Sequence, residues 1–500
     1  MKNLLALLLL LAFFTSKAQE DGDDLFDDGF LHEIRFTTVD TNFFIATKEY
    51  QQVDLELDGN ALDGVGFKRK GNISAYPTTN KYGIKIKTNK YVDGQEYDGI
   101  KEFTLHINYQ DPSLMREKLT YDICDEMGLF SLRTSFAKVY INDIYWGLYT
   151  LVEGKDEMYK QVFDNRDMDA IESLDFGNMC YISDNPDDYN YEAPGTDWPY
   201  YILENGDPLT AWPSFANMID VLNNTPTADF MSVASNYLNV KDFFTYQAVN
   251  VYLLNFDSYI SFRGNQIYVY DETANKWQVT PWDFNASFGL WETSETADAY
   301  PMIPDVISSG CIASKMTEIT ALEDHYLTAM CLLNNTVADT MTLFAKIDGW
   351  YDQIKDAVYE DSRKVITNAQ FDNGVGEGYQ SLFGENIPGL KTFIRDRQLF
   401  IKQELTDAGF DCEALGLGIN DPVNDQPIIL YPNPANNWIS LKGIENVSEI
   451  TLYNSQGQIV LNSTNVQEKV DIGSLENGFY FVRITDQNAM SSTIQLQILR

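Results

Sequence analysis

Histidine is scarce in this sequence: 500 residues contain only His32, His106 and His325, and none adjoins a recognisable serine or cysteine nucleophile motif. A Ser-His-Asp hydrolase and a histidine-rich metal site are therefore poor expectations. The five cysteines form no Cys-x-x-Cys pair, which argues against a zinc ribbon, and their odd number leaves at least one thiol free or paired between chains. Any chemistry is expected to use carboxylates, amides and lysines with a hard metal ion.

Positive charge is also scarce. The chain has 35 lysines and arginines against 74 aspartates and glutamates, and its formal net charge is −39 at pH 7. A nucleic-acid-binding protein needs the opposite sign, so no nucleic acid is expected as a partner. Solubility and resistance to association explain the acidity most simply, and loose binding of Ca²⁺ or another hard cation is the alternative.

Long apolar runs are absent after the first residues, so no transmembrane anchor is predicted. The start of the chain is typical of a secretory signal peptide. Lys2 is followed by the apolar run LLALLLLLAFF and then by TSKAQE, which places small residues at the −3 and −1 positions of a cut after Ala18. We therefore predict a signal peptide over residues 1–18 and a secreted mature chain.

The mature chain divides by composition into an arm, a large body and a small tail. Residues 19–31 are acidic and contain glycine, so they are predicted to form a mobile arm. The body, residues 32–412, begins with short strands and turns mainly helical from about Val240. A Gly-, Asn-, Asp- and Pro-containing linker, residues 413–427, leads to residues 428–500, where strands recur at spacings of roughly ten residues, as in a small all-β sandwich.

Two segments of the body carry clear local signals. In DPSLMREKL, Asp111 is a plausible N-cap with Pro112 at the first helical position, which predicts a helix that Gly128 closes. In FAKVYINDIYWGLYTLVE, the pair Asn142-Asp143 is expected at the turn of a β-hairpin.

A carboxylate stands between two aromatic residues in VTPWDFNASFG, where Asp283 follows a predicted strand. Burying such a group is costly unless a cation, a metal or a set of hydrogen bonds holds it. Asn265 and Asp283 lie at the ends of two strands joined by a polar turn, so antiparallel pairing would bring them close. A carboxylate and an amide carbonyl are suitable ligands for Mg²⁺.

Lysines occupy one face of the strand YGIKIK. Lys85 and Lys87 share that face, while Ile84 and Ile86 point the other way. Taken alone, such lysines are more typical of a solvated strand face. The nearby KRKGN stretch, with Lys70, could line a phosphate site together with backbone N–H groups.

The tail resembles a known sorting signal. YPNPANNWISLKG, ITLYNSQGQIVL and LENGFYFVRIT resemble, in this order, the C-terminal sorting domain of the type IX secretion system. The resemblance implies type IX machinery as a partner and passage across the outer membrane, with the body released or attached to the cell surface. An ordinary adhesive β-sandwich is the alternative.

The body resembles the spore-coat protein H (CotH) kinase family over roughly residues 32–405. Six segments resemble the family's motifs in the right order: VGFKRKGNIS, YGIKIK, DPSLMREKL, VYINDIYWGLYTLVE, NFDSYISFRGNQIYVYDETANKWQVTPWDFNASFG and LKTFIRDRQLFI. The resemblance implies an α+β, atypical protein-kinase-like body followed by the all-β tail domain. It also implies ATP as a substrate, with Mg²⁺ or Mn²⁺ as cofactor.

The same resemblance assigns roles to individual residues. Asp283 would hold the metal, with Asn265 as its second ligand, and Asp257 matches the family's catalytic aspartate. The nucleotide site would take Lys85 first, and then Lys87, Lys70 and Glu153. Asp257 could instead serve only as a helix-to-loop cap, and Glu153 could pair with a lysine or meet the nucleotide.

Three departures from the family pattern bear on activity. Asn285 stands where the family commonly has a second aspartate, so a second metal would bind more weakly. Lys70 and Ile73 replace an arginine and a serine of the family's turn, and arginine and lysine are not equivalent at a bidentate site. The stretch NMCY lacks the lysine of the family's Leu-Tyr-Lys motif.

Three functions remain open from the sequence. The first is a secreted Mg²⁺-dependent kinase that acts on a hydroxyl of exported or surface protein. The second is a catalytically inactive surface binding or scaffold protein on the same fold. The third, a calcium-bound adhesin or glycan-related module, draws on the acidity and on Trp198 and Trp212.

Overall fold

The structure, a computed structural model, describes most of the chain; its described residues are 20–193, 195–261, 264–290, 296–380, 386–413, 429–431, 435–442, 447–454, 459–463, 469–475, 478–486 and 491–498. The predicted signal peptide lies outside them, as does all but the first residue of the predicted linker. The chain divides into two compact units, Met1–Cys412 and Glu413–Arg500, and each is described by itself.

A closed seven-stranded barrel forms the first part of unit 1. Its strands, in spatial order, are β1 (His32–Thr37), β2 (Gln51–Leu57), β3 (Asn60–Tyr76), β4 (Lys81–Lys87), β5 (Glu102–His106), β7 (Ile144–Glu153) and β6 (Thr134–Ile141). Alternating apolar residues turn inward, because successive side chains on a strand point to opposite faces. Every strand fills the interior, for example with Ile34, Val53, Phe67, Ile84, Phe103, Val139 and Leu151.

The predicted fold class, an α+β body like that of an atypical protein kinase, is wrong. The N-terminal strands do not form an open sheet, because β1 pairs in parallel with β6 and closes the barrel. That pairing joins segments far apart in the chain, which local hydrophobic patterns do not specify. The predicted hairpin within the barrel does form: β6 and β7 pair antiparallel around Asn142 and Asp143, both at positive φ.

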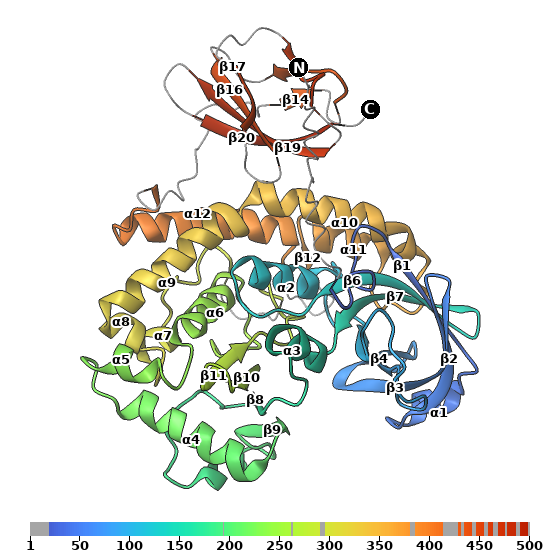
Figure 1. Cartoon of the computed structure of the whole chain (residues 1–500), viewed down its shortest axis with the longest axis vertical. Helices are drawn as coiled ribbons and strands as arrows, with labels where there is room; N and C mark the ends of the chain where they lie inside the picture. Colours follow the sequence, from blue (N-terminus) through green and yellow to red (C-terminus); the bar gives the residue numbers. More distant parts are fainter. Residues whose placement is uncertain are drawn as a thin grey trace, which may run out of the picture. The chain divides into compact units, whose positions relative to one another are not determined.

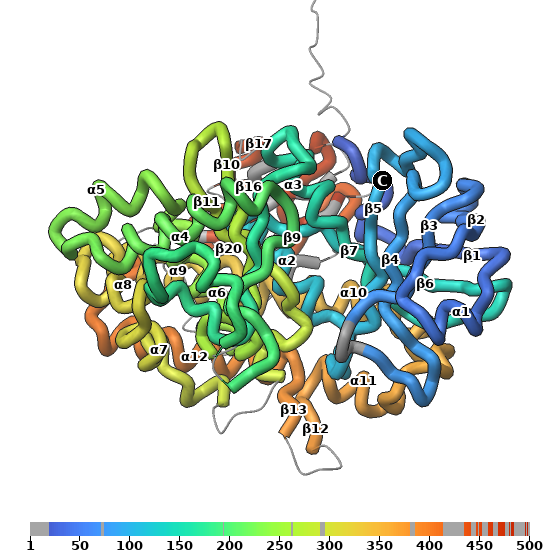
Figure 2. Tube along the Cα trace, turned by 90° about the horizontal axis from the view of Figure 1, so that it is seen from below, coloured from blue at the N-terminus to red at the C-terminus, as the bar shows by residue number. Residues whose placement is uncertain are grey.

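The rest of unit 1 surrounds a second, four-stranded antiparallel sheet. Its strand order is β11 (Lys276–Thr280), β10 (Gln266–Asp271), β8 (Ala170–Ser173) and β9 (Tyr201–Asn205). Figures 1 and 2 show the barrel on one side of the unit and the second sheet on the other. Helices α4 and α6 lie on the side of the second sheet, and α2 and α3 lie between the two sides. A two-stranded sheet, β12 (Tyr379–Gln380) and β13 (Asn386–Ile387), stands apart.

Helices make up much of the remainder; those described are α1 (Thr41–Ala46), α2 (Arg116–Glu126), α3 (Lys155–Phe163), α4 (Pro208–Asn224), α5 (Phe230–Ala234), α6 (Val240–Tyr252), α7 (Asp305–Ser309), α8 (Lys315–Glu318), α9 (Thr320–Leu332), α10 (Thr340–Glu360), α11 (Asn368–Val375) and α12 (Leu390–Asp407). Short 3₁₀ and π turns occupy Pro186–Asn190 and Leu333–Val337. Among the described helices, none is both long and apolar enough to span a membrane.

The helix predicted from Pro112 begins four residues later, at Arg116. Asp111 does not cap it at the expected position. Its carboxylate instead accepts the backbone N–H groups of Ser113 at 2.8 Å and Arg116 at 2.9 Å, and pairs with the Arg116 guanidinium at 2.5 Å. Both partners of this pair are buried, so Asp-Pro-Ser-x-x-Arg folds as a closed turn that precedes the helix.

The acidic arm is docked rather than mobile. Leu25 and Phe26 are buried with the barrel core, and the carboxylate of Asp98 accepts the backbone N–H of Asp24 at 2.8 Å. Asp28 also pairs with Lys118 at 2.9 Å. Composition alone suggested disorder here, but two apolar residues and these anchoring contacts are sufficient to order the segment.

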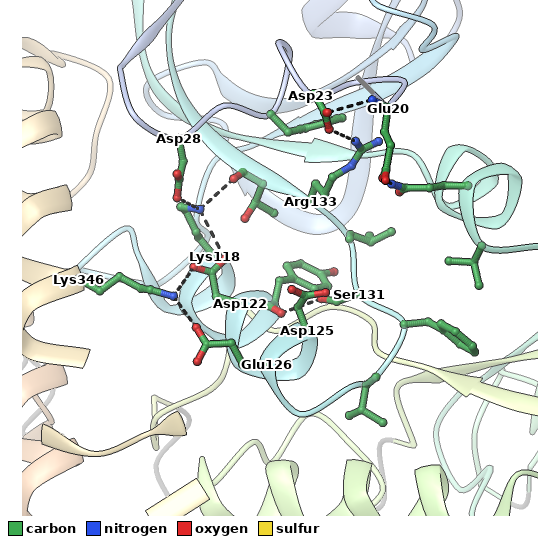
Figure 3. A pocket seen from close by; sticks show the side chains of 18 residues that line it. Glu20, Asp23, Asp28, Lys118, Asp122, Asp125, Glu126, Ser131, Arg133 and Lys346 are labelled. Atoms are coloured by element: carbon green, nitrogen blue, oxygen red, sulfur yellow. Dashed lines mark hydrogen bonds and ion pairs between the residues drawn. The ribbon is translucent and has the colours of Figure 1, made fainter. Parts of the chain in front are cut away.

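The arm forms one wall of a pocket of about 600 Å³ beside α2 (Figure 3). Lys118 and Lys346 lie within it and share Asp122, and Lys346 also contacts Glu126 at 3.0 Å. Its acidic side chains are thus partly neutralised by lysines of the same pocket.

Two disulfides cross-link unit 1, Cys180–Cys311 and Cys331–Cys412. The second joins the end of α9 to the last residue of the unit. Cys124, the remaining cysteine, is a free buried thiol.

Unit 2 is all-β, as predicted. One sheet contains β14 (Ile429–Tyr431), β15 (Trp438–Lys442) and β18 (Val470–Asp471), and the other contains β17 (Ile459–Ser463), β16 (Val447–Asn454), β19 (Gly478–Asp486) and β20 (Ser491–Ile498). Side chains from both sheets share one buried core, including Ile439, Val470, Leu452, Val482 and Leu496.

A buried ion pair fastens the barrel to the loop after α10. Lys81 of β4 contacts Asp361, and the two side chains are 2% and 1% exposed. Asp361 also accepts the backbone N–H groups of Leu148, Arg363 and Lys364. Gly147 is required beside it, because a Cβ there would lie 2.4 Å from the Asp361 carboxylate.

Removing this carboxylate should destabilise unit 1. Asp361→Ala leaves the Lys81 ammonium buried without its partner, and we expect a loss of about 3–5 kcal/mol in the free energy of unfolding. Denaturant titration measures the loss. Asp348→Ala is the matched control, because its pair with Lys391 is exposed (60% and 26%) and should cost under about 1 kcal/mol. Equal losses in the two variants would contradict this role of Asp361.

Candidate functional site

Asp283 and Asn265 lie together beside the second sheet. Strands β10 and β11 pair antiparallel with Ile267 opposite Thr280, so residues just before β10 and just after β11 are neighbours. The Asn265 side chain hydrogen-bonds to the Asp283 carboxylate. The structure thus brings together the two residues that the sequence suggested as metal ligands.

The backbone conformation of Asp283 and the burial of its charge both cost free energy. Its φ is +55°, in the left-handed region that non-glycine residues seldom adopt. Burial raises the pKa of its carboxyl, and Glu117 raises it further, while His106, Lys70 and the hydrogen bond from Asn265 lower it. A strained residue with a desolvated carboxylate is typical of a functional position.

Lys70 of β3 reaches toward Asp283 across the outer face of the barrel. Its Nζ contacts His106 Nε2 on β5 and lies 5.9 Å from the centre of the Trp282 ring. This path crosses Gly83 of β4, where a Cβ would lie 2.9 Å from Lys70 Cγ. Burial lowers the pKa of Lys70 to about 8, although the Glu117 and Asp283 carboxylates raise it.

His106 links this lysine to a buried carboxylate on α2. Its Nδ1 lies 2.8 Å from Glu117 Oε1, and its Nε2 lies 3.0 Å from Thr104 Oγ1. Donation from Nδ1 to Glu117 leaves Nε2 as the acceptor for the Lys70 ammonium. The resulting Glu117–His106–Lys70 chain holds the amine of Lys70 in a fixed position on the barrel face.

A second cation reaches the site from α3. Lys155 Nζ pairs with Glu204 at 2.9 Å and lies 4.5 Å from the centre of the Trp282 ring. Glu172 of β8 lies beside Glu204. Burial raises the pKa of Glu172, and the Glu204 and Asp283 carboxylates raise it further, while Lys155 lowers it. Acidic and basic groups from four strands (β3, β5, β8 and β9) and two helices (α2 and α3) therefore meet around Trp282 and Asp283.

The other two predicted lysines lie further along the same barrel face. Lys85 pairs with Glu102 on the neighbouring strand, and Lys87 stands opposite Glu102 and Gly66 in the register. Lys85 is close enough to Lys70 to lower the pKa of Lys70. The three lysines thus share one surface, with Lys70 nearest to Asp283.

Glu153 and Asp257 do not take part in the contacts described above. Glu153 stands opposite Phe103, whose side chain is in the barrel core, and its carboxylate accepts Arg133 Nε at 3.1 Å. Asp257 is buried in the loop after α6, and its backbone N–H donates to Asn255 Oδ1 at 3.3 Å. The side chains of residues 72–74, including Ile73, lie outside the described residues.

The oxygen atoms around Asp283 suit a hard divalent cation. Asn285 Oδ1 is buried and, among the described residues, accepts no hydrogen bond, although Asn285 Nδ2 donates to Tyr109 O at 3.4 Å. Asp283, Asn265 and Asn285 together offer a carboxylate and two amide carbonyls. Mg²⁺ commonly uses one or two carboxylates and takes its other ligands from water and phosphate. No group of three His, Cys, Asp or Glu side chains placed for a metal occurs within the part of the chain that the structure describes.

Comparison with known families identifies both units. The family described as CotH kinase protein matches residues 67–401, more than half of the chain. The chain belongs to the CotH kinase family. The secretion system C-terminal sorting domain matches residues 429–498, which indicates export to the cell surface or beyond.

Curated relatives include proteins from bacteria and a fungus. Inner spore coat protein H of Bacillus subtilis is 29% identical over 203 residues, which are 39% of this chain and 51% of that protein. Invasin CotH2 of Rhizopus delemar is 24% identical over 48% of this chain and 43% of that protein. The chain therefore matches only about half the length of these relatives.

Solved structures give weaker likenesses. The match to the Helicobacter pylori proinflammatory kinase CtkA covers 68% of this chain and 94% of that chain, at 13% identity and with a TM-score of 0.28. The match to PorZ of the Porphyromonas gingivalis type IX secretion system covers 15% of this chain and 11% of that chain, at 18% identity and with a TM-score of 0.13. Neither score is high enough to carry an argument about the fold.

Sequence reasoning missed several residues of this site, including His106, Glu117, Lys155, Glu172 and Glu204. The sequence places His106 on the same strand face as Thr104, but the position of Thr104 opposite Lys85 comes only from the register of β4 and β5. The others come from separate elements, and only the tertiary structure brings them together.

Lys70 should react as an amine at lower pH than an ordinary lysine. Its pKa of about 8 predicts that the rate of acylation at Lys70 rises with a midpoint near pH 8, against about 10.4 for a model lysine. Mass spectrometry of the labelled chain measures this profile. Asp283→Asn should move the midpoint lower because it removes a charge that raises the pKa, whereas Asp348→Asn should not. A midpoint above pH 10 in the unmodified chain would contradict the burial of this amine.

Proposed function

We propose that this CotH-family protein is an exported phosphotransferase that moves the γ-phosphoryl group of ATP to a hydroxyl of exported or surface protein. The observation that carries the proposal is the strained, desolvated Asp283, hydrogen-bonded to Asn265 and faced by Lys70. Membership of the CotH kinase family supports the choice of reaction.

Phosphoryl transfer depends mainly on positioning and on neutralising charge. Asp283 and Asn265, with Asn285 beside them, are the residues that would hold a divalent cation. Bound there, Mg²⁺ or Mn²⁺ would neutralise charge on the β- and γ-phosphates. Lys70, fixed by His106 and Glu117, is placed to contact phosphate oxygens on the same side.

Lys85 and Lys87 would serve the outer part of the triphosphate. Lys85 would have to exchange its contact with Glu102 for a phosphate oxygen, which is feasible because the lysine side chain is 31% exposed. Lys87 follows on the same strand face. Glu153 stays outside this set of phosphate contacts, because its carboxylate accepts Arg133 Nε rather than a lysine.

Asp257 is the proposed base. The acceptor oxygen would form its bond to the γ-phosphorus as the bond from that phosphorus to the bridging oxygen breaks and ADP leaves. The proton of the hydroxyl would pass to the Asp257 carboxylate. This role rests on the match to the family's motif, together with the burial of Asp257 in the loop that follows α6.

A surface scaffold without turnover is the second candidate function. Asn285 in place of a second aspartate favours it, because an amide brings no charge to a second metal. Trp198 and Trp212, cited for a glycan-related function, differ in the structure: Trp198 is 57% exposed, whereas Trp212 is 6% exposed and belongs to the core.

Calorimetric titration of ATP, with and without Mg²⁺, tests the nucleotide site. We expect metal-dependent binding to the unmodified chain, loss of at least tenfold in affinity in Asp283→Ala, and no change in Asp348→Ala.

Asp257→Ala should still bind ATP but lose transfer to protein hydroxyls by at least a hundredfold. Absence of binding under every condition would favour the scaffold function.

A further inference from the structure

Lysines form a continuous row on the outer face of the barrel, leading away from Asp283. In the register of β3 and β4, Lys68 stands directly opposite Lys85, and Gly66 stands opposite Lys87. Side chains two residues apart on a strand share a face, so Lys70, Lys68, Lys85 and Lys87 all project from this surface. Lys70 marks the end of the row near Asp283.

The far end of the row is built around a glycine. A Cβ at Gly66 would lie 2.6 Å from Lys90 Cβ and 3.1 Å from Tyr50 Cδ1, so only glycine lets Lys90 and Tyr50 lie against the strand. Lys68 and Lys90 place their ammonium groups 4.6 and 5.1 Å from the centre of the Tyr50 ring. The tyrosine thus gathers two cations at one point.

This arrangement has an electrostatic cost. Like charges directly opposite on neighbouring strands destabilise a sheet. Burial lowers the pKa of Lys68, and Lys85 and Lys90 lower it further, while Glu102 and Glu49 raise it. Around Lys68, three lysines (Lys68, Lys85 and Lys90) therefore meet two carboxylates (Glu102 and Glu49), in a chain with 35 basic and 74 acidic residues. An acidic ligand would relieve the repulsion.

We propose that Lys68 and Lys90, gathered on the Tyr50 ring, bind an extended acidic segment of the protein substrate, with its phosphoacceptor hydroxyl held at the Asp283 end. The proposal deepens the proposed function by naming the class of protein that the site selects. Lys70, Lys85 and Lys87 remain the phosphate contacts, and Lys68 and Lys90 determine substrate specificity.

The length of the row sets the expected spacing of acidic residues. From Lys70 to the level of Gly66 is about four strand positions, or about 13 Å at about 3.3 Å each. An extended peptide covers this distance in about four residues. Acidic side chains two to four residues from the acceptor hydroxyl would therefore lie over Lys68 and Lys90.

The negative net charge of the protein restricts the binding of acidic segments to this one face. A net charge of −39 repels acidic proteins at long range, so an acidic segment can bind only where lysines exceed carboxylates. Binding should consequently be sensitive to salt and confined to this face.

Fluorescence anisotropy without ATP tests the proposal on the full exported chain. The probes are labelled peptides with one serine and three glutamates, placed either before or after it, and matched peptides with glutamine in place of glutamate. We expect one glutamate peptide to bind at least tenfold more tightly than its glutamine counterpart. The double variant Lys68→Gln, Lys90→Gln should lose this difference, and Lys68→Arg, Lys90→Arg should retain it.

Controls separate this site from the nucleotide site. Lys355→Gln, Lys391→Gln removes two lysines of α10 and α12 and should leave peptide affinity unchanged. Asp283→Ala should abolish transfer and still bind the glutamate peptide. Where transfer occurs, the Lys68 and Lys90 glutamine variant should raise KM for the peptide severalfold with little change in kcat or in KM for ATP.

Two results would overturn the proposal. One is equal affinity for glutamate and glutamine peptides. The other is loss of ATP affinity, rather than peptide affinity, in the Lys68 and Lys90 variant, which would place these lysines in the nucleotide site. Failure of ATP to bind the unmodified chain, with selective peptide binding intact, would refute the phosphotransferase and leave the acidic-segment site standing.

Discussion

The desolvated carboxylate of Asp283 is the constraint around which the rest of unit 1 is arranged. Such a group persists only if donors and cations surround it. The loop before β10 contributes Asn265, and the barrel contributes Lys70 and His106, which Glu117 of α2 holds in place. No single element could supply all of these groups, so the site requires the barrel and the second sheet to be held at a fixed separation.

Buried polar anchors hold that separation. Arg116 donates to Pro388 O at 2.6 Å and joins the start of α2 to the loop before α12. Arg397 of α12 donates to the carbonyl oxygens of Val251 and Tyr252 at 3.0 and 3.1 Å, which satisfies the end of α6. The pair Lys81–Asp361 then joins the barrel to the loop after α10, and it forms only when the barrel is docked on the helices. These contacts therefore give the site its geometry rather than its chemistry.

Local chemistry made parts of this structure predictable from the sequence. Asn142-Asp143 suits a tight turn, and alternation of apolar residues marked the strands that flank Asn265 and Asp283. Closure of the barrel was not predictable in this way, because β1 and β6 pair in parallel across a long stretch of chain. His106 was missed for a similar reason: its meaning depends on Glu117 and Lys70, which come from another helix and another strand. The docked arm shows the limit of composition, since Leu25 and Phe26 outweigh the surrounding acidic residues.

The disulfide Cys331–Cys412 has a mechanical consequence. Cys412 is the last residue of unit 1, and the chain beyond it leads to the sorting domain that directs export. If the protein is held at a cell surface through its tail, a pulling force enters the body at this residue. The bond passes that force directly to α9, which packs its buried face against α6, so that α12 is not unwound from its end. A pulling force on the tail is thus carried by the disulfide and α9, and the residues around Asp283 keep their relative positions.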